Sequence, residues 1–380
     1  MKEADRLQHI KEYYFSKKLA EIKRLQAQGK PVINLGIGNP DLSPPLSVIQ
    51  KMQEIIQQKD IHGYQSYRGH PEFRQSIADF YKKYYAVELN PETQILPLTG
   101  SKEGILHISM AFLNPGDKVL IPNPGYMTYR SASLLAGGII EEYNLTEKNH
   151  YQPDFEELES MDLSQIKIMW VNYPHMPGGA VADKSLFEKL VYFANKHNIL
   201  IINDNPYSFI LNNSPESILK YDENFTNILE LNSLSKSHNM AGWRVGMLSG
   251  SEQHINAVLK FKSNMDSGMF LATQLAATEA LKSKEIWFEQ INQIYKKRKR
   301  LAEKIFDALE ITYQKNQAGL FLWGKLPENI HSKDFTDQLL YNKNIFLSPG
   351  FIFGSNGNKY VRLSITNPEE VLKEVLKRIS

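Results

Sequence analysis

The chain has 380 residues, 42% of them hydrophobic and 23% charged, with 44 basic and 42 acidic side chains and a net charge of +2. This is ordinary globular composition, and the balanced charge gives no electrostatic reason to expect nucleic acid or a membrane surface as a partner. The chain has no cysteine, which excludes disulfides, thiolate zinc sites and cysteine nucleophiles.

The first segment of the chain is charged and lacks the apolar core of a signal peptide, as residues 1–6 show. The longest apolar runs, such as residues 168–171, are far too short to span a bilayer. We therefore expect a cytoplasmic protein. Across residues 6–28, apolar side chains recur at roughly helical spacing with charges between them, which predicts an amphipathic helix that Gly29 and Pro31 end.

Short apolar runs alternate with helical patterns through the middle of the chain. The runs that resemble strands are residues 94–99, 118–121, 139–143, 167–171, 200–203, 228–231 and 245–248. Helical patterns, such as residues 184–197, fall between several of them. This alternation predicts an α/β fold with a mainly parallel seven-stranded sheet and helices on both faces.

The last third of the chain has a different pattern. Residues 273–309 predict one long helix, residues 320–323 and 360–365 predict short strands, and a further helix closes the chain. We expect a smaller α+β domain here, formed by residues 1–45 and 273–380, beside a large domain over residues 46–272. The basic run at residues 296–300 lies inside the long helix, and we interpret it as a solvated helix face rather than a nucleic-acid patch.

The most informative segment is residues 233–246, SLSKSHNMAGWRVG. Here Lys236 follows a predicted strand, with Ser233 and Ser235 before it and Arg244 eight residues after it. The two hydroxyls and the guanidinium could converge on a phosphate, whose oxygens match the arginine fork. Lys236 would lie beside that phosphate and could attack an aldehyde to give a Schiff base. A lone lysine of this kind is usually a solvated loop residue, but the whole arrangement favours the functional interpretation.

This segment resembles the cofactor-lysine motif of the fold type I aminotransferases, which use pyridoxal 5'-phosphate. Further blocks match in the family's order: residues 35–41 (LGIGNPD), Tyr64 with Gly69 and Arg74, and residues 123–126 (NPGY), 204–207 (DNPY) and 360–364 (YVRLS). Among these families the chain looks closest to the LL-diaminopimelate and related class I aminotransferases. The resemblance implies a homodimer with shared active sites, in which Tyr64 reaches the cofactor phosphate of the neighbouring subunit.

Gly100, Ser101 and Lys102 lie between a predicted strand and a predicted helix. Free N–H groups and the helix dipole make such a terminus an anion site, so we expect it to form the second half of the phosphate cup. Taken alone, the segment would be an ordinary helix start. It is not a Walker A loop, because the glycine-containing lead-in is missing.

Three residues are expected to hold the cofactor ring. Asp204 ends a predicted strand, and a buried carboxylate there needs a cationic partner, which the pyridinium nitrogen would supply. Tyr207 would donate a hydrogen bond to the phenolate oxygen, and Tyr126 would stack on the ring. The alternative interpretations are a helix-capping aspartate and packed tyrosines.

On the substrate side, Arg362 lies on a predicted strand and must be paired if it is buried. The α-carboxylate of an amino acid would pair it, and Ile37 and Gly38 are expected nearby. The sequence does not indicate which amino acid is used. A dicarboxylic substrate would need a second cation, for which Lys102 and Arg68 are the candidates, with Arg68 expected to be merely exposed.

One block departs from the family pattern. Residues 172–179 align with the family's Asn-Pro-Thr-Gly segment, but Met176 stands where the asparagine is expected and Gly178 replaces the threonine. The resemblance implies that the asparagine donates hydrogen bonds to the cofactor phenolate and the substrate carboxylate. A thioether cannot donate them.

These residues predict an aminotransferase that moves an amino group from an L-amino acid to a 2-oxo acid, with Lys236 as the Schiff-base lysine and as the general base at Cα. No metal site is predicted. A carbon–sulfur lyase or a decarboxylase on the same fold would share these motifs and stays open as an alternative. A regulator that uses the fold as a sensor would carry an added DNA-binding domain, whereas the segment before Leu35 reads as one helix.

Overall fold

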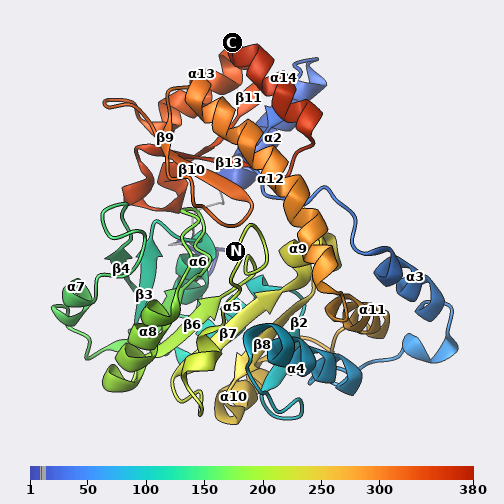
Figure 1. Cartoon of the computed structure of the whole chain (residues 1–380). Coiled ribbons are helices and arrows are strands. Elements are labelled where there is room, and N and C mark those ends of the chain that lie inside the picture. Colours follow the sequence, from blue (N-terminus) through green and yellow to red (C-terminus); the bar gives the residue numbers. More distant parts are fainter. Residues whose placement is uncertain (9, 11–13) are drawn as a thin grey trace.

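The computed structural model describes residues 1–8, 10 and 14–380, and it is built around a seven-stranded sheet (Figure 1). The strand order is β2-β8-β7-β6-β5-β3-β4, and only β8 runs antiparallel to its neighbours. The strands are β2 (Ile95–Leu98), β3 (Lys118–Asn123), β4 (Ile139–Asn144), β5 (Ile166–Val171), β6 (Leu200–Asp204), β7 (Ile228–Ser233) and β8 (Gly246–Gly250). The prediction of a mainly parallel seven-stranded sheet is confirmed.

Both faces of this sheet are covered, which explains why its strands read as continuous apolar runs. In β5, Ile168 and Trp170 enter one core cluster, while Met169 and Val171 enter another on the opposite face. The first cluster is closed by α5 (Ser101–Phe112), α6 (Met127–Leu135) and α10 (Glu252–Lys262), and the second by α4 (Pro71–Tyr85) and α8 (Lys184–His197). The sheet is therefore the middle layer of three.

A second structural unit combines a segment near the N-terminus with the C-terminal part of the chain. Its four-stranded antiparallel sheet has the order β12-β13-β10-β9, and β1 pairs with β11 in parallel. In Figure 1, the blue N-terminal helix α2 lies beside the orange and red C-terminal elements. The unit's elements are α2 (Tyr14–Ala27), β1 (Ile33–Asn34), α12 (Glu285–Ala308), β9 (Thr312–Tyr313), β10 (Phe321–Lys325), α13 (Ser332–Lys343), β11 (Ile345–Phe346), β12 (Ser348–Pro349), β13 (Tyr360–Ser364) and α14 (Glu369–Ile379).

Two predicted helices are interrupted. Residues 6–28 contain the end of α1 (Asp5–Gln8) and all of α2, with Ile10 outside both helices; residues 9 and 11–13 lie outside the described part of the chain. Residues 273–309 form most of α11 (Leu271–Leu281) and all of α12, with a break at residues 282–284. The shorter elements are α3 (Leu46–Ile55), α7 (Phe155–Glu159), α9 (Leu234–Ser237), η1 (Lys59–Ile61), η2 (Ile218–Tyr221), η3 (Ala241–Trp243), η4 (Gly350–Phe353) and η5 (Ser355–Gly357). Within the described ranges, no helix combines the length and hydropathy needed to cross a membrane.

The basic run on α12 is only partly the solvated face that we expected: Lys296, Lys297 and Arg300 are exposed, whereas Arg298 is not. Arg298 is buried and forms a bidentate ion pair with Asp41, with N···O distances of 2.6 and 2.8 Å. Its neighbour Lys299 donates to two backbone carbonyls at 2.7 Å. Arg298 lies three residues after buried Tyr295 and four before buried Ala302, so it belongs to the apolar stripe of the helix. The expectation was wrong for Arg298, because its ion-pair partner comes from a segment far away in the sequence.

Candidate active site

A cavity of about 630 Å³ opens where β5, β6 and β7 end, between the large sheet and the second unit. Ligands of open α/β sheets bind beyond the carboxyl ends of the strands, and this volume suits a small-molecule site. The predicted site residues that line it are Ile37, Gly38, Ser101, Lys102, Tyr126, Asp204, Tyr207, Ser233, Ser235, Lys236, Arg244 and Arg362. Gly100 lies directly beside Arg244, whereas Tyr64 does not line the cavity.

Lys236 lies on α9, the short helix that follows β7. Its Nζ donates a hydrogen bond of 2.8 Å to the carbonyl oxygen of Gly38. Burial, together with the positive charges of Arg362 and Arg244, lowers the pKa of Lys236 to about 8. A lysine with such a pKa is partly neutral near physiological pH, so its amine can act as a nucleophile or a base.

Gly100, Ser101 and Arg244 converge at one end of the cavity. Gly100 has φ +87°, and a Cβ on it would lie 2.1 Å from Nη2 of Arg244, so only glycine allows the guanidinium to approach the start of α5. No side chain caps that helix, which leaves its first N–H groups available to an anion. The Ser233 and Ser235 hydroxyls lie 2.9 Å apart in the same region. These groups have the chemistry of a phosphate cup.

Asp204 ends β6 with a buried carboxylate. Its Oδ2 accepts a 2.8 Å hydrogen bond from the Tyr129 hydroxyl, whereas Oδ1 is buried with no hydrogen-bond partner in the described part of the chain. Burial raises the pKa of Asp204 to about 7, although the Tyr129 hydrogen bond lowers it. A buried carboxylate with an open oxygen fits a cationic N–H donor such as a protonated pyridine nitrogen. Tyr129 was missed in the sequence; its signal is its position three residues after Tyr126 in the same segment.

The two predicted tyrosines both line the cavity. Tyr126 directly precedes α6 and packs edge-on against Tyr129, with ring centroids 5.6 Å apart. Tyr207 is buried and packs edge-on against Phe321, with centroids 6.0 Å apart. Aromatic packing therefore fixes both side chains at the cavity wall.

Arg362 is buried on β13 among three aromatic rings. Its guanidinium carbon lies 3.8, 4.6 and 5.7 Å from the ring centroids of Phe321, Phe353 and Phe15. Nη2 donates to the Gly36 carbonyl at 2.9 Å, and Nη1 approaches Sδ of Met176 at 3.1 Å. The three rings come from segments far apart in the sequence, so no local pattern could have predicted them.

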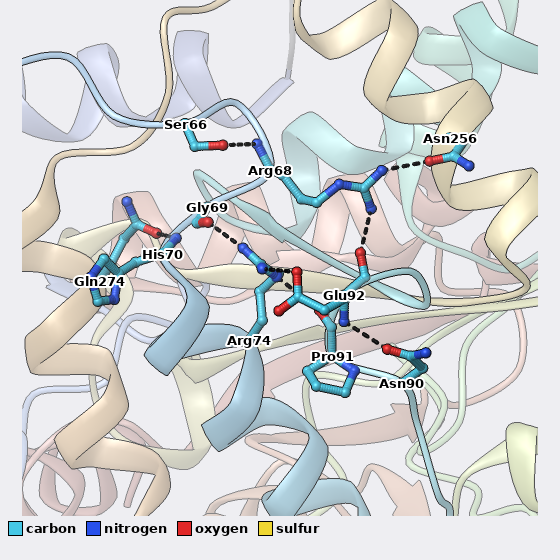
Figure 2. A network of polar contacts seen from close by, with 10 residues as sticks. All are labelled: Ser66, Arg68, Gly69, His70, Arg74, Asn90, Pro91, Glu92, Asn256 and Gln274. Atoms are coloured by element: carbon cyan, nitrogen blue, oxygen red, sulfur yellow. Dashed lines mark hydrogen bonds and ion pairs between the residues drawn. The ribbon is translucent and has the colours of Figure 1, made fainter.

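Figure 2 shows the polar network around residues 66–74. Arg74 is buried and donates to the Glu92 carboxylate at 2.6 Å and to the Pro91 carbonyl at 2.8 Å. Arg68 donates to the Glu92 carbonyl at 2.9 Å and to Asn256 Oδ1 at 2.6 Å. Both arginines therefore hold this loop in place, and Arg68 does not line the cavity. Tyr64, which lies before this network in the chain, is 92% exposed.

Comparison with known proteins agrees with this geometry. The family model for aminotransferase class I and II matches residues 30–379. The chain is 39% identical to an LL-diaminopimelate aminotransferase from Oleidesulfovibrio alaskensis, over 99% of this chain and 98% of that protein. Transaminase BacF from Bacillus subtilis is 38% identical, over 96% and 92% of the two chains. The apo-BacF structure superimposes with a TM-score of 0.96 at 36% identity, covering 100% of this chain and 98% of that chain. The structure of an aspartate aminotransferase from Thermotoga maritima superimposes with a TM-score of 0.92 at 31% identity, covering 99% of this chain and 98% of that chain.

Proposed function

Since the chain belongs to the class I and II aminotransferases, which depend on pyridoxal 5'-phosphate, we propose how its own residues hold this cofactor and its substrates. The chain transfers an amino group between an amino acid and a 2-oxo acid. The carbon–sulfur lyase and decarboxylase alternatives are not favoured, because the curated relatives described above carry the names of aminotransferases or transaminases. The main support for the proposal is Oδ1 of Asp204, which is buried without a hydrogen-bond partner among the described residues. Asp204 lines the same cavity as Lys236.

The phosphate of the cofactor would bind at the start of α5. There the N–H groups of Ser101 and Lys102, the hydroxyl of Ser235 and the guanidinium of Arg244 would supply the donors. The Ser233 hydroxyl donates to the Val245 carbonyl and would position Ser235, whose hydroxyl lies 2.9 Å away. The close contact that Gly100 allows with Arg244 supports this assignment. Arginine and helix N-termini are both suited to a doubly charged phosphate.

Asp204 would hold the ring nitrogen, Tyr207 would donate to the ring oxygen, and Tyr126 would pack against one ring face. When bound, the cofactor supplies an electron sink for the charge that develops at the substrate Cα. Tyr129 would position Asp204 through the 2.8 Å hydrogen bond to Oδ2, so that Oδ1 stays directed at its cation. The unpartnered Oδ1 supports this arrangement.

Lys236 would anchor the cofactor covalently and, once released by the substrate, move a proton at the substrate Cα. Its lowered pKa, about 8, suits both tasks near neutral pH. Arg362 would bind the substrate α-carboxylate, with Ile37 and Gly38 along the same wall. The aromatic rings around Arg362 exclude water and so strengthen its attraction for a carboxylate.

We also propose that the enzyme is a homodimer in which Tyr64 serves the partner's phosphate. Tyr64 is 92% exposed and precedes the segment that holds the network of Figure 2. Exposed apolar side chains also occur in adjoining segments, at Ile56, Tyr67, Met265 and Phe270, and α3 packs against α11. A Cβ on Gly268 would lie 2.6 Å from the Gln65 carbonyl, so the two loops touch. Such a surface suits a protein partner.

The division into a large domain over residues 46–272 and a small domain of residues 1–45 and 273–380 remains our proposal. The pairing of β1 with β11 supports assigning the N-terminal segment to the C-terminal unit. The cytoplasmic location remains a prediction from the sequence.

Borohydride reduction of the yellow holo-enzyme, followed by peptide mapping, tests the cofactor assignment. We expect the reduced adduct on Lys236 and none on exposed Lys102, its neighbour in the cavity. Lys236→Ala should abolish turnover but still bind some cofactor through the phosphate cup. An adduct mapped to another lysine would show that the assignment is wrong.

A further inference from the structure

We propose that the amino acid this enzyme prefers carries an uncharged apolar or aromatic side chain, with Phe15, Leu19 and Ile37 forming the wall against which that side chain packs. This inference builds on the proposed function, because it takes Arg362 as the group that binds the α-carboxylate. It goes further in assigning the substrate class and the residues that select it.

The wall is built around Arg362. Phe321, Phe353 and Phe15 surround the guanidinium at 3.8, 4.6 and 5.7 Å, so the region beside the α-carboxylate site is aromatic. Phe15 and Leu19 come from one face of α2 four residues apart, and both line the cavity. Met176 adds a thioether where a polar amide was expected, which removes a polar group from the same region.

All but one of the charged groups of the cavity are already assigned. Its charged lining residues in the described chain are Lys102, Asp204, Lys236, Arg244 and Arg362. Asp204 and Lys236 serve the cofactor ring, and Arg244 lies against the start of α5. Lys102 is the second residue of α5, next to Ser101, and is exposed to solvent. A substrate carboxylate beside the aromatic rings would find no second cation there.

Arg68, the other cation considered for a dicarboxylic substrate, is held elsewhere. Its guanidinium donates to the Glu92 carbonyl and to Asn256 of its own subunit (Figure 2), and Arg68 does not line the cavity. Burying a charge without a partner is costly, whereas an apolar side chain gains free energy from the same surface. The geometry therefore disfavours aspartate, glutamate and diaminopimelate, although two of the comparison proteins are named for such substrates.

α2 is fixed firmly enough to act as a selective wall. Lys18, between Phe15 and Leu19, is buried and pairs with Asp337 of α13 at 2.9 Å and with Glu21 at 2.8 Å. These two carboxylates raise the pKa of Lys18 against the opposing effect of burial. The helix therefore presents Phe15 and Leu19 to the cavity from a fixed position.

The experiment measures the first half-reaction of the holo-enzyme with single amino acids, through the change in cofactor absorbance. We expect kcat/KM for phenylalanine and for leucine to exceed the values for glutamate, aspartate and diaminopimelate by about tenfold or more. An acidic amino acid or diaminopimelate reacting as fast as phenylalanine and leucine would overturn the inference and leave the proposed function intact. Reaction with no amino acid would instead contradict the proposed function.

Binding of unreactive carboxylates gives a readout that does not depend on turnover. By calorimetry, 3-phenylpropionate should bind the holo-enzyme about tenfold more tightly than glutarate. Glutarate carries a second carboxylate, whereas 3-phenylpropionate carries an apolar ring in its place. Equal affinities would overturn the inference.

A matched pair of variants tests the wall itself. Leu19→Ala should lower the ratio of kcat/KM for phenylalanine to that for alanine by about tenfold, since it removes apolar surface from the side-chain pocket. Ile22→Ala, on the same helix but buried away from the cavity, should leave that ratio unchanged. The ratio cancels any loss of folded protein. An unchanged ratio in Leu19→Ala would overturn the assignment of this wall.

Discussion

Nη1 of Arg362 lies 3.1 Å from the sulfur of Met176, so the group proposed to bind the substrate carboxylate is in contact with a thioether. Two polar side chains of the same segment already have partners away from Arg362. The Asn172 side chain donates to the Asp204 carbonyl and accepts from the Met176 N–H. His175 faces away, with Nε2 3.1 Å from the Pro124 carbonyl oxygen.

Met176→Asn should therefore change the holo-enzyme. The new amide would donate a hydrogen bond to the cofactor phenolate. The phenolate would then be a poorer acceptor for the proton on the nitrogen that joins the cofactor to Lys236, so that nitrogen would lose its proton at lower pH. We expect the pH midpoint of the visible absorbance change to fall and amino acids to bind more tightly. A spectrophotometric titration measures this, with Met176→Leu as the control that adds no donor. If the Met176→Asn and wild-type titrations overlay, another group already supplies this bond.

Cofactor uptake by the apo-protein should follow the titration of Lys236. Because the pKa of Lys236 is lowered to about 8, its amine is protonated and unreactive below that pH and becomes nucleophilic as the pH rises through it. The uptake rate should rise with a midpoint near pH 8. Arg362→Leu removes a charge that lowers this pKa, so it should move the midpoint upward. Arg378→Leu, on α14, is the charge-matched control. A wild-type midpoint near 10.5, the ordinary value of lysine, would contradict the prediction.

Asp204→Asn should cost far more in kcat than Tyr207→Phe. Asp204→Asn loses a charged hydrogen bond to the ring, which corresponds to roughly 1.5–3 kcal/mol, or about tenfold to a hundredfold in rate. Tyr207→Phe loses a neutral hydrogen bond, which corresponds to about fivefold. Steady-state kinetics at saturating cofactor make the comparison. Equal losses would contradict the role of Asp204 in stabilising charge on the ring.

The same substitution should stabilise the apo-protein in a pH-dependent way. The pKa of Asp204 is raised from 3.8 to about 7, so the folded state binds the proton more tightly than the unfolded chain does. Stability is therefore lost as the pH rises from about 4 to 7, where the carboxylate must ionise while buried. The gain in Tm of apo Asp204→Asn over wild type should be larger at pH 8 than at pH 5. A gain that is independent of pH would contradict the raised pKa.

Mixing two inactive variants tests the shared site. If Tyr64 acts on the partner, refolded mixtures of Tyr64→Ala and Lys236→Ala should regain about a quarter of wild-type activity, because half of the dimers are mixed and each has one intact site. Tyr64→Ala alone must first prove impaired. An active monomer, or no gain on mixing, would contradict sharing.

The sequence predicted the large sheet well, because strands buried on both faces, such as Ile166–Val171, leave continuous apolar runs. It also predicted the cavity residues that follow these strands, such as Asp204 and Lys236, because the site motifs are local. The aromatic surroundings of Arg362 were not predictable, since Phe15 and Phe321 meet only through tertiary structure. The ion pair of Arg298 with Asp41 was missed for the same reason.

The pairing of an early segment with a late one has a consequence for biosynthesis. The Ser348 hydroxyl donates to the Gly36 carbonyl across 312 positions of sequence, and β1 pairs with β11, which begins at Ile345. On the ribosome, the segment with Phe15 and Gly38 emerges first, but the elements against which it packs are made last. The seven-stranded sheet can assemble in the meantime, because domains fold as units during synthesis. The wall that carries Arg362 is therefore completed at the end of translation, and a chain that stops before Ile345 would contain the cofactor lysine but no place for a substrate carboxylate.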